Sequence, residues 1–461
     1  MRSTGVAVVG FGTVGAGVVR LLVEDAARIE QAAGCRLALR HVCDVDLKRP
    51  RAVQAPKGLL TDDLERVLAD ADTHVVVETV GGTTVAVDIM KRALAAGKDV
   101  VTANKAALAE RGAELFEAAR RAGRSISFEA SCAAGIPVIR AIRDGLIANR
   151  ITALLGILNG TCNYILTEMS ATGEAYGRAL ADAQAKGYAE PDPRLDISGE
   201  DARHKLAVLA GLAFGAEVRL ADVYVEGIAD LDPSDLRYGK QLGYTLKLLA
   251  IGREVDGALS LRVHPTFVPD GSPLATVGGA DNAVLVTGHA VGDTFYTGPG
   301  AGQMPTASSI VADIVDAALG RARLTFEHVA LLAGRPRTIP VQPIEDVWTR
   351  YYLRFDVVDE PGVLAAIAGV LGRHKISLAS VLQHESADPK SVPLVITTHL
   401  AREGSVSASL EEIRGLAVVV GRSVRIRMLE GTETPPASAA GEADGPPPDG
   451  AGAPRPRKAA P

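Results

Sequence analysis

The segment "VAVVGFGTVGAGVV", residues 6–19, is an apolar run that passes directly into a glycine-rich turn and then into a helix-like stretch. Gly10 permits the tight turn, Gly12 lets the backbone approach a pyrophosphate, and Gly15 lets the helix pack on the strand. The helix start would face the anion. The complete predicted loop is Gly10, Phe11, Gly12, Thr13, Val14 and Gly15. Such a pattern can also be a purely structural turn, but the strand-to-helix context favours dinucleotide binding.

Segments that follow this loop alternate between strand-like and helix-like patterns, which is typical of a parallel, doubly wound sheet. The expected strands are 6–9, 37–43, 74–79, 99–103 and 125–129. One helix is expected from the loop to about residue 32, and another around 84–96. We therefore predict an α/β domain of the Rossmann type over residues 1–135.

The remaining chain divides into four parts. Residues 136–325 mix strands with longer helices and predict an α+β domain, and residues 326–349 predict a linker. Residues 350–430 have the order strand, helix, strand, strand, helix, strand. Residues 431–461 are rich in Pro, Ala and Gly and poor in large apolar groups, so we expect them to be disordered.

Composition narrows the class of ligand. The 461 residues carry a formal net charge of −6 without long runs of one sign, so neither nucleic acid nor a membrane is the expected partner. The N-terminal apolar run is cut by glycines, which argues against a signal peptide or a membrane span. The cysteines have neither a disulfide nor a zinc spacing, which indicates a reducing cytoplasm. They are Cys35, Cys43, Cys132 and Cys162.

The second predicted strand ends at Asp44, and this residue bears on the choice of dinucleotide. A carboxylate there favours a free ribose 2′-hydroxyl and therefore NAD. Lys48, Arg49 and Arg51 follow closely and could instead hold the 2′-phosphate of NADP. The sequence leaves both cofactors open.

The segment "YAEPDPRLDISGEDARHKLAVLA", residues 188–210, places two charges on the apolar side of a predicted helix. Asp201 and Lys205 fall on that stripe, whereas His204 is expected to point away from it. Ser198 is expected to cap the helix, with Asp201 completing a capping box. A buried pair costs several kcal/mol unless both ions are satisfied, so we expect either a structural ion pair or a functional site.

Two further segments place reactive side chains after predicted strands, where open α/β sheets bind ligands. Lys105 in "VVTANKAAL" is either solvated or functional. Cys132 in "SFEASCAAGIP" is either an inert buried thiol or a nucleophile, as in phosphorylating aldehyde dehydrogenases. The match to the phosphorylating aldehyde dehydrogenases stops after Ser131 and Cys132.

Six segments together make the chain resemble the homoserine dehydrogenases of the long bacterial type that end in an ACT domain. They are "GFGTVGAGV" (10–18), "TANKAAL" (102–108), "FEASCAAGIPVI" (128–139), "LNGTCNYI" (158–165), "KGYAEPDPRLDISGEDARHKLAVLA" (186–210) and "GPGAGQMPTASSIVADI" (298–314). The resemblance covers residues 5 to about 428. It implies reversible NAD(P)-dependent oxidation of L-homoserine to L-aspartate 4-semialdehyde, on the path to threonine, methionine and isoleucine.

This resemblance also implies roles for individual residues. Lys205 matches the acid/base lysine, Asp201 a substrate-binding carboxylate, and Glu190 the acid that holds the substrate amino group. Lys105 is a second candidate for the proton. The residues expected at the substrate or the cofactor beyond these are Asp192, Asp196, Gly187 and Gly302. Asp192 and Asp196 can equally be residues that only fix their turn.

A monovalent cation, expected to be sodium, is also implied by the resemblance. Its ligands would be the Glu129 side chain and the backbone carbonyls of Cys132, Ala134 and Ile136. Residue type alone does not predict this site, because carbonyl ligands leave no trace in a sequence.

The segment "LRFDVVDEPGVLAAIAGVLGRHKISLASVLQHE" resembles an ACT domain. Pro361 and Gly362 follow Asp359 at the expected start of its first helix, which can hold an amino-acid carboxylate at a subunit interface. The resemblance implies feedback inhibition by L-threonine and a homodimer or homotetramer. An ACT fold that only assists assembly is the alternative.

Two hypotheses from other classes compete with the dehydrogenase. An amino-acid sensor with a decayed nucleotide domain is disfavoured because the glycines, both lysines and the carboxylate loop are all present. A phosphorylating semialdehyde enzyme would need phosphate and a Cys132 thiolate.

Overall fold

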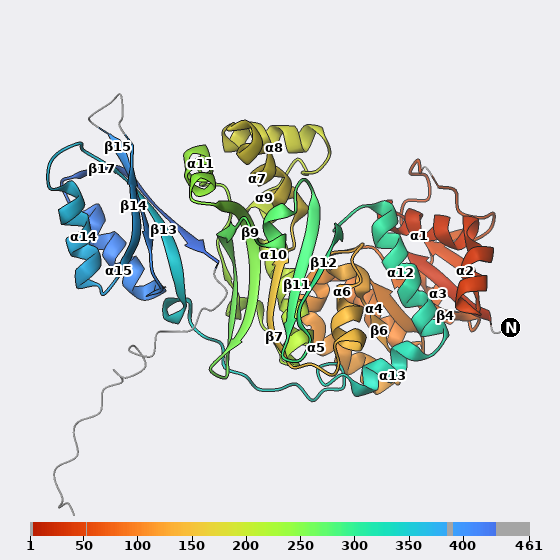
Figure 1. The fold of residues 1–461 in the computed structure, drawn as a ribbon. Helices are drawn as coiled ribbons and strands as arrows, with labels where there is room; N and C mark the ends of the chain where they lie inside the picture. Colours follow the sequence, from red (N-terminus) through yellow and green to blue (C-terminus); the bar gives the residue numbers. More distant parts are fainter. Residues whose placement is uncertain (1–2, 52, 385–390, 430–461) are drawn as a thin grey trace, which may run out of the picture.

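The computed structural model describes residues 3–51, 53–384 and 391–429, and its ribbon shows three bodies in a row (Figure 1). The predicted tail, 431–461, lies outside the described residues. None of the described helices is both long and apolar enough to cross a membrane.

The N-terminal body is built on a six-stranded parallel sheet. Its strands are β1 (Ser3–Val9), β2 (Arg36–Cys43), β3 (Leu60–Thr61), β4 (Thr73–Glu78), β5 (Asp99–Thr102) and β6 (Ile126–Ser127). They lie in the order β3-β2-β1-β4-β5-β6. This order confirms the predicted Rossmann-type fold, and it places the expected ligand crevice where the order reverses, beside the carboxyl ends of β1 and β4.

The helices of this body are α1 (Thr13–Glu24), α2 (Ala26–Ala33), α3 (Leu64–Ala69), α4 (Val85–Ala95) and α5 (Lys105–Ala122). The prediction of a single helix after the first strand is wrong, because the chain leaves helical geometry at Asp25 and two helices form. The Asp25 carboxylate accepts a hydrogen bond from Arg28 at the start of the second helix. The strand predicted over 125–129 is shorter, and a 3-10 turn (Glu129–Ser131) follows β6.

A second sheet of eleven strands occupies the rest of the molecule. Its strands are β7 (Ile151–Ile157), β8 (Tyr224–Val225), β9 (Tyr244–Val255), β10 (Ala258–Pro269), β11 (Asp281–Gly288), β12 (Gly292–Pro299), β13 (Trp348–Val357), β14 (Leu378–Gln383), β15 (Val392–Thr398), β16 (Ala401–Arg402) and β17 (Val419–Met428). The main path is β12-β11-β7-β9-β10-β17-β13-β15-β14. One sheet therefore runs through the central and C-terminal bodies.

The helices of the central and C-terminal bodies are α6 (Val138–Arg140), a π turn (Ala141–Gly145), α7 (Gly160–Thr172), α8 (Tyr176–Ala185), α9 (Arg194–Ile197), α10 (Glu200–Phe214), α11 (Pro233–Gln241), α14 (Val363–Arg373) and α15 (Glu403–Arg414). Two more, α12 (Gln303–Ala318) and α13 (Arg321–His328), return to the N-terminal body (Figure 1). There α12 packs on α1 at Gly17, where a Cβ would lie 2.8 Å from Gln303 Cγ.

The C-terminal body has the predicted order β13, α14, β14, β15, α15, β17, which confirms the ACT fold. Its helix α14 begins after Gly362, whose φ is 93° and which has no side chain to cap the helix, and Pro361 beside it is exposed. Asp235 of α11 accepts two hydrogen bonds from Arg354 of β13, at 2.6 and 3.1 Å, so a buried ion pair fixes this body to the central one.

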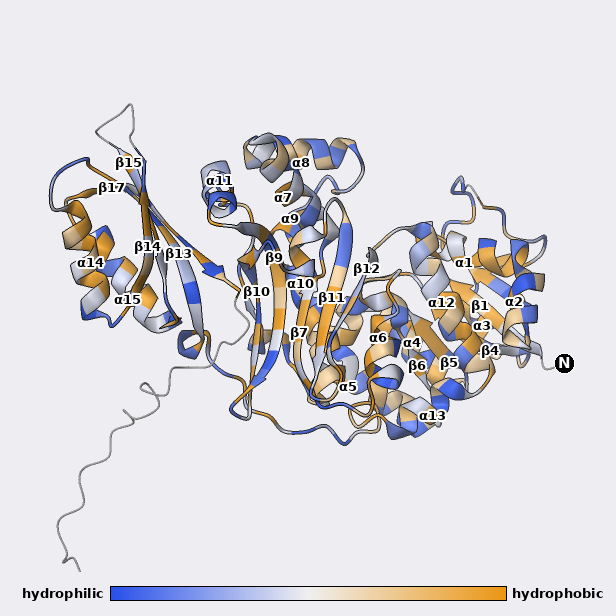
Figure 2. Ribbon diagram, viewed as in Figure 1, coloured by the Kyte–Doolittle hydropathy of each residue, from blue (hydrophilic) through white to orange (hydrophobic). Residues whose placement is uncertain are grey.

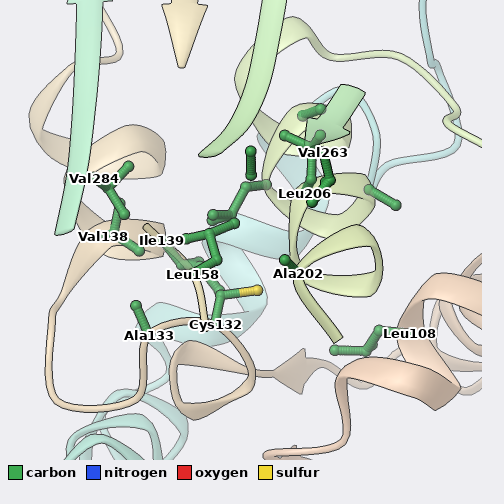
Figure 3. Packing of buried hydrophobic residues seen from close by; sticks show 14 of the residues in the cluster. Leu108, Cys132, Ala133, Val138, Ile139, Leu158, Ala202, Leu206, Val263 and Val284 are labelled. Atoms are coloured by element: carbon green, nitrogen blue, oxygen red, sulfur yellow. The ribbon is translucent and has the colours of Figure 1, made fainter. Parts of the chain in front are cut away.

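Because aromatic residues are few, Val, Leu, Ile and Ala supply most of the buried core. Figure 2 shows hydrophobic stretches along strands of both sheets. Figure 3 shows one part of this core, in which Leu158, Ala202 and Leu206 gather around the α10 region next to Cys132. The apolar support beneath α10 positions its charged residues.

Candidate active site

The glycine-rich loop lies at the carboxyl end of β1. Gly10 has a φ of 98°, and a Cβ there would lie 2.7 Å from the Thr79 carbonyl carbon. A Cβ on Gly15 would lie 1.9 Å from the Gly10 oxygen, so the strand and helix approach closely. Gly12 faces open space, and α1 begins at Thr13 without a side-chain cap. Free helix N–H groups beside open space fit a pyrophosphate, so these residues fit a dinucleotide.

Gly302, predicted to approach the cofactor, comes close to this loop. Its φ is 115°, and the next residue, Gln303, donates from Nε2 to the Thr13 carbonyl at 3.0 Å. The turn before α12 therefore lies against the N-terminus of α1.

Hydrogen bonds fix the neighbouring loops of the same sheet edge. Glu78, at the end of β4, accepts bonds from the Val80 and Gly81 amides, both at 2.8 Å, and from the Thr102 hydroxyl at 2.6 Å. Asn104, which caps α5, donates to the Gly82 carbonyl at 2.7 Å. Sequence reasoning missed this network, although a Glu and an Asn directly after buried strands were a visible signal.

Asp201 lies between two lysine ammonium groups. Lys105 Nζ, at the start of α5, is 3.0 Å from Asp201 Oδ1, and Lys205 Nζ, one turn along α10, is 2.7 Å from Asp201 Oδ2. Lys205 also donates to the Leu158 carbonyl at 2.7 Å. The Lys205 side chain is 11% exposed and the Lys105 side chain 34%, so the cluster opens toward solvent on the Lys105 side.

Asn159 joins this cluster to Asp196. Its Nδ2 donates to Asp201 Oδ2 at 2.8 Å and to Asp196 Oδ1 at 2.7 Å. Its Oδ1 caps α7 by accepting the Cys162 amide at 2.8 Å. Asn159 was not predicted, although an Asn between the strand-like "GIL" and a helix is a common cap signal.

The charges of the cluster are strongly coupled. Burial raises the pKa of Asp201, but Lys205, Lys105 and the hydrogen bonds outweigh it and hold that pKa well below its usual range. Burial lowers the pKa of Lys105, yet Asp201 and more distant Asp196 outweigh it, so its pKa is raised. Asp196 has a raised pKa because it is buried. In this state Lys105 is held as an ammonium, which must lose its proton before it can act as a base.

Other predicted substrate residues lie at the rim. Glu190 is exposed, and its backbone carbonyl accepts a bond from Gln184 at 3.2 Å. Asp192 is exposed and pairs with Arg194 at 2.5 Å, so the structure does not bring it into the Asp201 cluster. Gly187 has a φ of 77° in the exposed turn after α8.

Two expectations about α10 are wrong. Ser198 does not cap it, because the helix begins after Gly199, whose φ of 86° no side chain tolerates well, and Ser198 Oγ bonds to Leu195 in α9. His204 does not point to solvent. It is buried, 3.7 Å from Glu110 of α5, because α5 covers the side of α10 expected to be exposed.

Cys132 is buried beside the cluster. Burial raises the pKa of its thiol to about 12, and its Sγ faces the Lys205 carbonyl at 3.7 Å. Figure 3 shows its sulfur among apolar side chains. These surroundings favour the inert thiol over the nucleophile.

Glu129 is buried near Asp313 and Arg140. Burial, with the charge of Asp313, raises the pKa of Glu129 to about 7, although its oxygens accept the amides of Ile139 and Arg140 at 3.0 and 2.9 Å. Ser309 donates to the Ala134 carbonyl at 2.5 Å, and Val138 to that of Ile136 at 2.8 Å. Within the described residues no three His, Cys, Asp or Glu side chains are grouped to hold a metal.

Three family models match the chain. They are described as homoserine dehydrogenase, NAD binding domain (10–129), homoserine dehydrogenase (137–315) and ACT domain (351–418). A homoserine dehydrogenase of Neisseria gonorrhoeae is 40% identical, over 93% of this chain and 99% of that protein. One of Pseudomonas aeruginosa is 42% identical over the same shares. The crystal structure of a homoserine dehydrogenase from Thiobacillus denitrificans, 41% identical, matches with a TM-score of 0.87 over 93% of this chain and 99% of that one.

Proposed function

The chain belongs to the homoserine dehydrogenase family, and from this premise we propose that it interconverts L-homoserine and L-aspartate 4-semialdehyde with NAD or NADP. It is an NAD(P)-dependent oxidoreductase. We further propose that it serves the synthesis of threonine, methionine and isoleucine in the cytoplasm. The four free, buried cysteines are compatible with a reducing compartment.

One observation carries this proposal: Asp201 holds a lysine from each of two domains beside the crevice of the nucleotide-binding sheet. Oxidation of a primary alcohol requires a group that takes the hydroxyl proton while hydride leaves. The bound nicotinamide supplies the hydride acceptor. Lys205 is the proposed acid/base residue, and Lys105 the proposed second candidate, which also binds near the cofactor.

Acidic side chains provide the proposed subsite for the substrate amino group. Asp201 and Asp196 are held by the shared amide of Asn159, so two carboxylates face one region in a fixed geometry. Glu190 would approach from the rim. Asp192 has the weakest support, because Arg194 already pairs with it.

Glu129 and the carbonyls of Cys132, Ala134 and Ile136 form the proposed site for a monovalent cation, expected to be sodium. The fit rests on charge, because two buried carboxyl groups, Glu129 and Asp313, share the guanidinium of Arg140, at 3.9 and 3.3 Å. A bound cation would stabilise this loop. If so, sodium chloride should raise the melting temperature more than an equal concentration of choline chloride does.

The ACT body is proposed to bind L-threonine as a feedback inhibitor at the start of α14. The uncapped helix start and exposed Pro361 support this position. An ACT body that only assists assembly into a homodimer or homotetramer is the alternative. Light scattering with and without L-threonine measures the oligomeric state, and the assay below measures inhibition.

The test uses the purified full chain with L-homoserine and NAD or NADP. We expect the reduced dinucleotide to form, L-aspartate 4-semialdehyde to drive the reverse reaction, and L-threonine to slow both. Formation of product without added phosphate rejects the phosphorylating alternative, and any turnover rejects the sensor. No turnover with either dinucleotide would contradict the proposal.

A further inference from the structure

A carboxylate is locked beneath the glycine-rich loop at the end of β2. Asp44 Oδ2 accepts the Phe11 amide at 2.6 Å, and its Oδ1 accepts the Asp46 amide at 2.9 Å. Burial raises the pKa of Asp44, but these bonds and Arg51 outweigh it, so the pKa is lowered and the group is an anion at neutral pH. In folds of this kind the end of the second strand faces the adenosine ribose.

Arg51, a candidate for binding the 2′-phosphate, already acts as a clamp inside this loop. Its Nε donates to the Phe11 carbonyl at 2.8 Å, and its Nη atoms donate to the carbonyls of Arg49 and Asp46 at 3.0 and 2.6 Å. Its guanidinium also lies 4.8 Å from the centre of the Phe11 ring and 3.4 Å from Asp44 Oδ1. The side chain is only 7% exposed. Turning this fork toward a phosphate would break several of these contacts.

Further carboxylates surround the end of β2. Asp46 Oδ1 accepts the amides of Lys48 and Arg49, at 3.1 and 3.0 Å, which fixes it in this loop. Asp62 and Asp63 follow β3, the strand that pairs with the end of β2. A phosphate dianion placed here would meet several like charges, whereas a ribose hydroxyl would meet acceptors.

We propose that the protein prefers NAD to NADP, with Asp44 as the residue that sets the preference and Arg51 as the clamp that positions it. This inference rests on the proposed function only for its kinetic assay. A free ribose 2′-hydroxyl can donate to the Asp44 carboxylate, whereas a 2′-phosphate can only accept bonds and is repelled. Lys48 and Arg49 are exposed, whereas Arg51 is the cation that pairs with Asp44.

The test measures equilibrium binding of NADH and of NADPH without substrate, and separately kcat/KM for NAD and NADP with L-homoserine. We expect the wild-type protein to favour NAD by at least about tenfold, as one charge-assisted hydrogen bond provides. Asp44→Asn keeps an acceptor for the Phe11 amide but removes the charge. It should reduce both preference ratios by about tenfold.

Two controls separate this effect from general electrostatics and from the rival role of Arg51. Asp72→Asn removes an equal charge before the amino end of β4, at the opposite ends of the parallel strands, where Asp72 is 75% exposed, and should leave the ratios unchanged. Arg51→Met should weaken the binding of NADH and of NADPH by the same factor. Selective loss of NADPH binding in Arg51→Met, a wild-type preference for NADP, or an unchanged ratio in Asp44→Asn would each overturn the proposal. If homoserine is not oxidised but NADH still binds better, the proposed function fails and this inference stands.

Discussion

Lys105 Nζ, at the first residue of α5, lies 3.0 Å from Oδ1 of Asp201, at the second residue of α10. The first helix belongs to the nucleotide-binding domain and the second to the central domain. This contact joins the two domains where a cofactor and a substrate would meet. Because Lys205 occupies the other oxygen of the same carboxylate, one buried acid orients both candidate proton carriers.

Replacement of Asn159 by Asp tests whether its amide positions the two carboxylates. The variant keeps the oxygen that caps α7, but the amide donor becomes a carboxylate oxygen. A third carboxylate then lies beside those of Asp196 and Asp201. We expect kcat/KM for homoserine to fall by at least about tenfold and the melting temperature to fall as well, because a lost bond to a charged group costs about 1.5–3 kcal/mol in the folded protein. Steady-state kinetics and thermal unfolding measure these effects.

Asn149→Asp is a matched control for that substitution. Asn149 Oδ1 accepts the Ala290 and Val291 amides at 3.2 and 3.0 Å, in the loop before β7 and outside the Asp201 cluster. It should retain wild-type kinetics. An Asn159→Asp variant as active as this control would show that the bridge has no role.

The pH dependence of homoserine oxidation tests the charge state of Lys105. Its pKa is raised, so the ligand-free protein holds an ammonium that must lose its proton before it can act as a base. We expect kcat/KM for oxidation to increase with pH through the neutral range. The titratable groups that act on Lys105 are Asp201, Asp196 and Cys132, and Lys205 lies on the other oxygen of Asp201.

Asp201→Asn removes the anion that raises this pKa. The increase of kcat/KM with pH should therefore occur about one pH unit or more lower than in the wild type, whatever the change in the maximum kcat/KM. Reduction of the semialdehyde should show the opposite pH trend, because it consumes the proton. A profile whose midpoint stays in place in Asp201→Asn would exclude both lysines as the titrating group, because Asp201 pairs with each of them.

Removal of the Cys132 thiol distinguishes the dehydrogenase from a thiolate enzyme. Because burial raises the pKa of Cys132 to about 12, the thiolate is not populated at neutral pH. Cys132→Ala should retain full turnover of homoserine without added phosphate. An inactive but folded variant, or a requirement for phosphate, would restore the nucleophile hypothesis.

The buried position of Lys247 leads us to predict that its contribution to stability rises with pH in the alkaline range. Burial lowers its pKa to about 8, and its Nζ contacts only neutral acceptors, Asn163 Oδ1 at 3.0 Å and the Val277 carbonyl at 2.5 Å. Its ammonium therefore loses its proton at lower pH in the folded state than in the unfolded state. Between about pH 8 and its ordinary pKa of about 10.4 the unfolded chain binds more protons, so this group's contribution to stability rises with pH.

Urea unfolding of wild type and Lys247→Met at about pH 7 and about pH 9.5 measures this contribution. The wild type should gain on the order of 2 kcal/mol over the variant between the two pH values. Lys240→Met, at an exposed position of α11, should show no such gain. A difference between wild type and Lys247→Met that does not change with pH would mean that Lys247 is solvated.

Features set by local pattern were predictable from the sequence. The apolar strands and the loop from Gly10 to Gly15 identified the nucleotide-binding fold, because glycine spacing and burial on both faces leave a direct trace. Asp201 and Lys205 stood out because two charges on an apolar helix stripe need a partner or a function. Helical spacing of four residues also predicted their contact, which is 2.7 Å.

Features set by tertiary contact were not predictable in this way. Ser198 is a good cap by local rules, but Gly199 is required at the turn because a Cβ there would lie 2.9 Å from Val225. His204 is buried only because α5, distant in sequence, covers it. Strands β10 and β17 pair in parallel through only two residue pairs, Thr266 with Arg427 and Phe267 with Met428. So short a pairing leaves no pattern in the sequence.

Turnover of L-homoserine by Lys205→Ala is the most direct test of the central claim, that the ammonium groups around Asp201 carry the proton. We predict that kcat falls by about three orders of magnitude, within the range for acid/base groups, while NADH binding and the melting temperature stay near wild type. Lys240→Ala, at the exposed position on α11, should keep full turnover. Near-normal turnover by a folded Lys205→Ala protein would contradict the account.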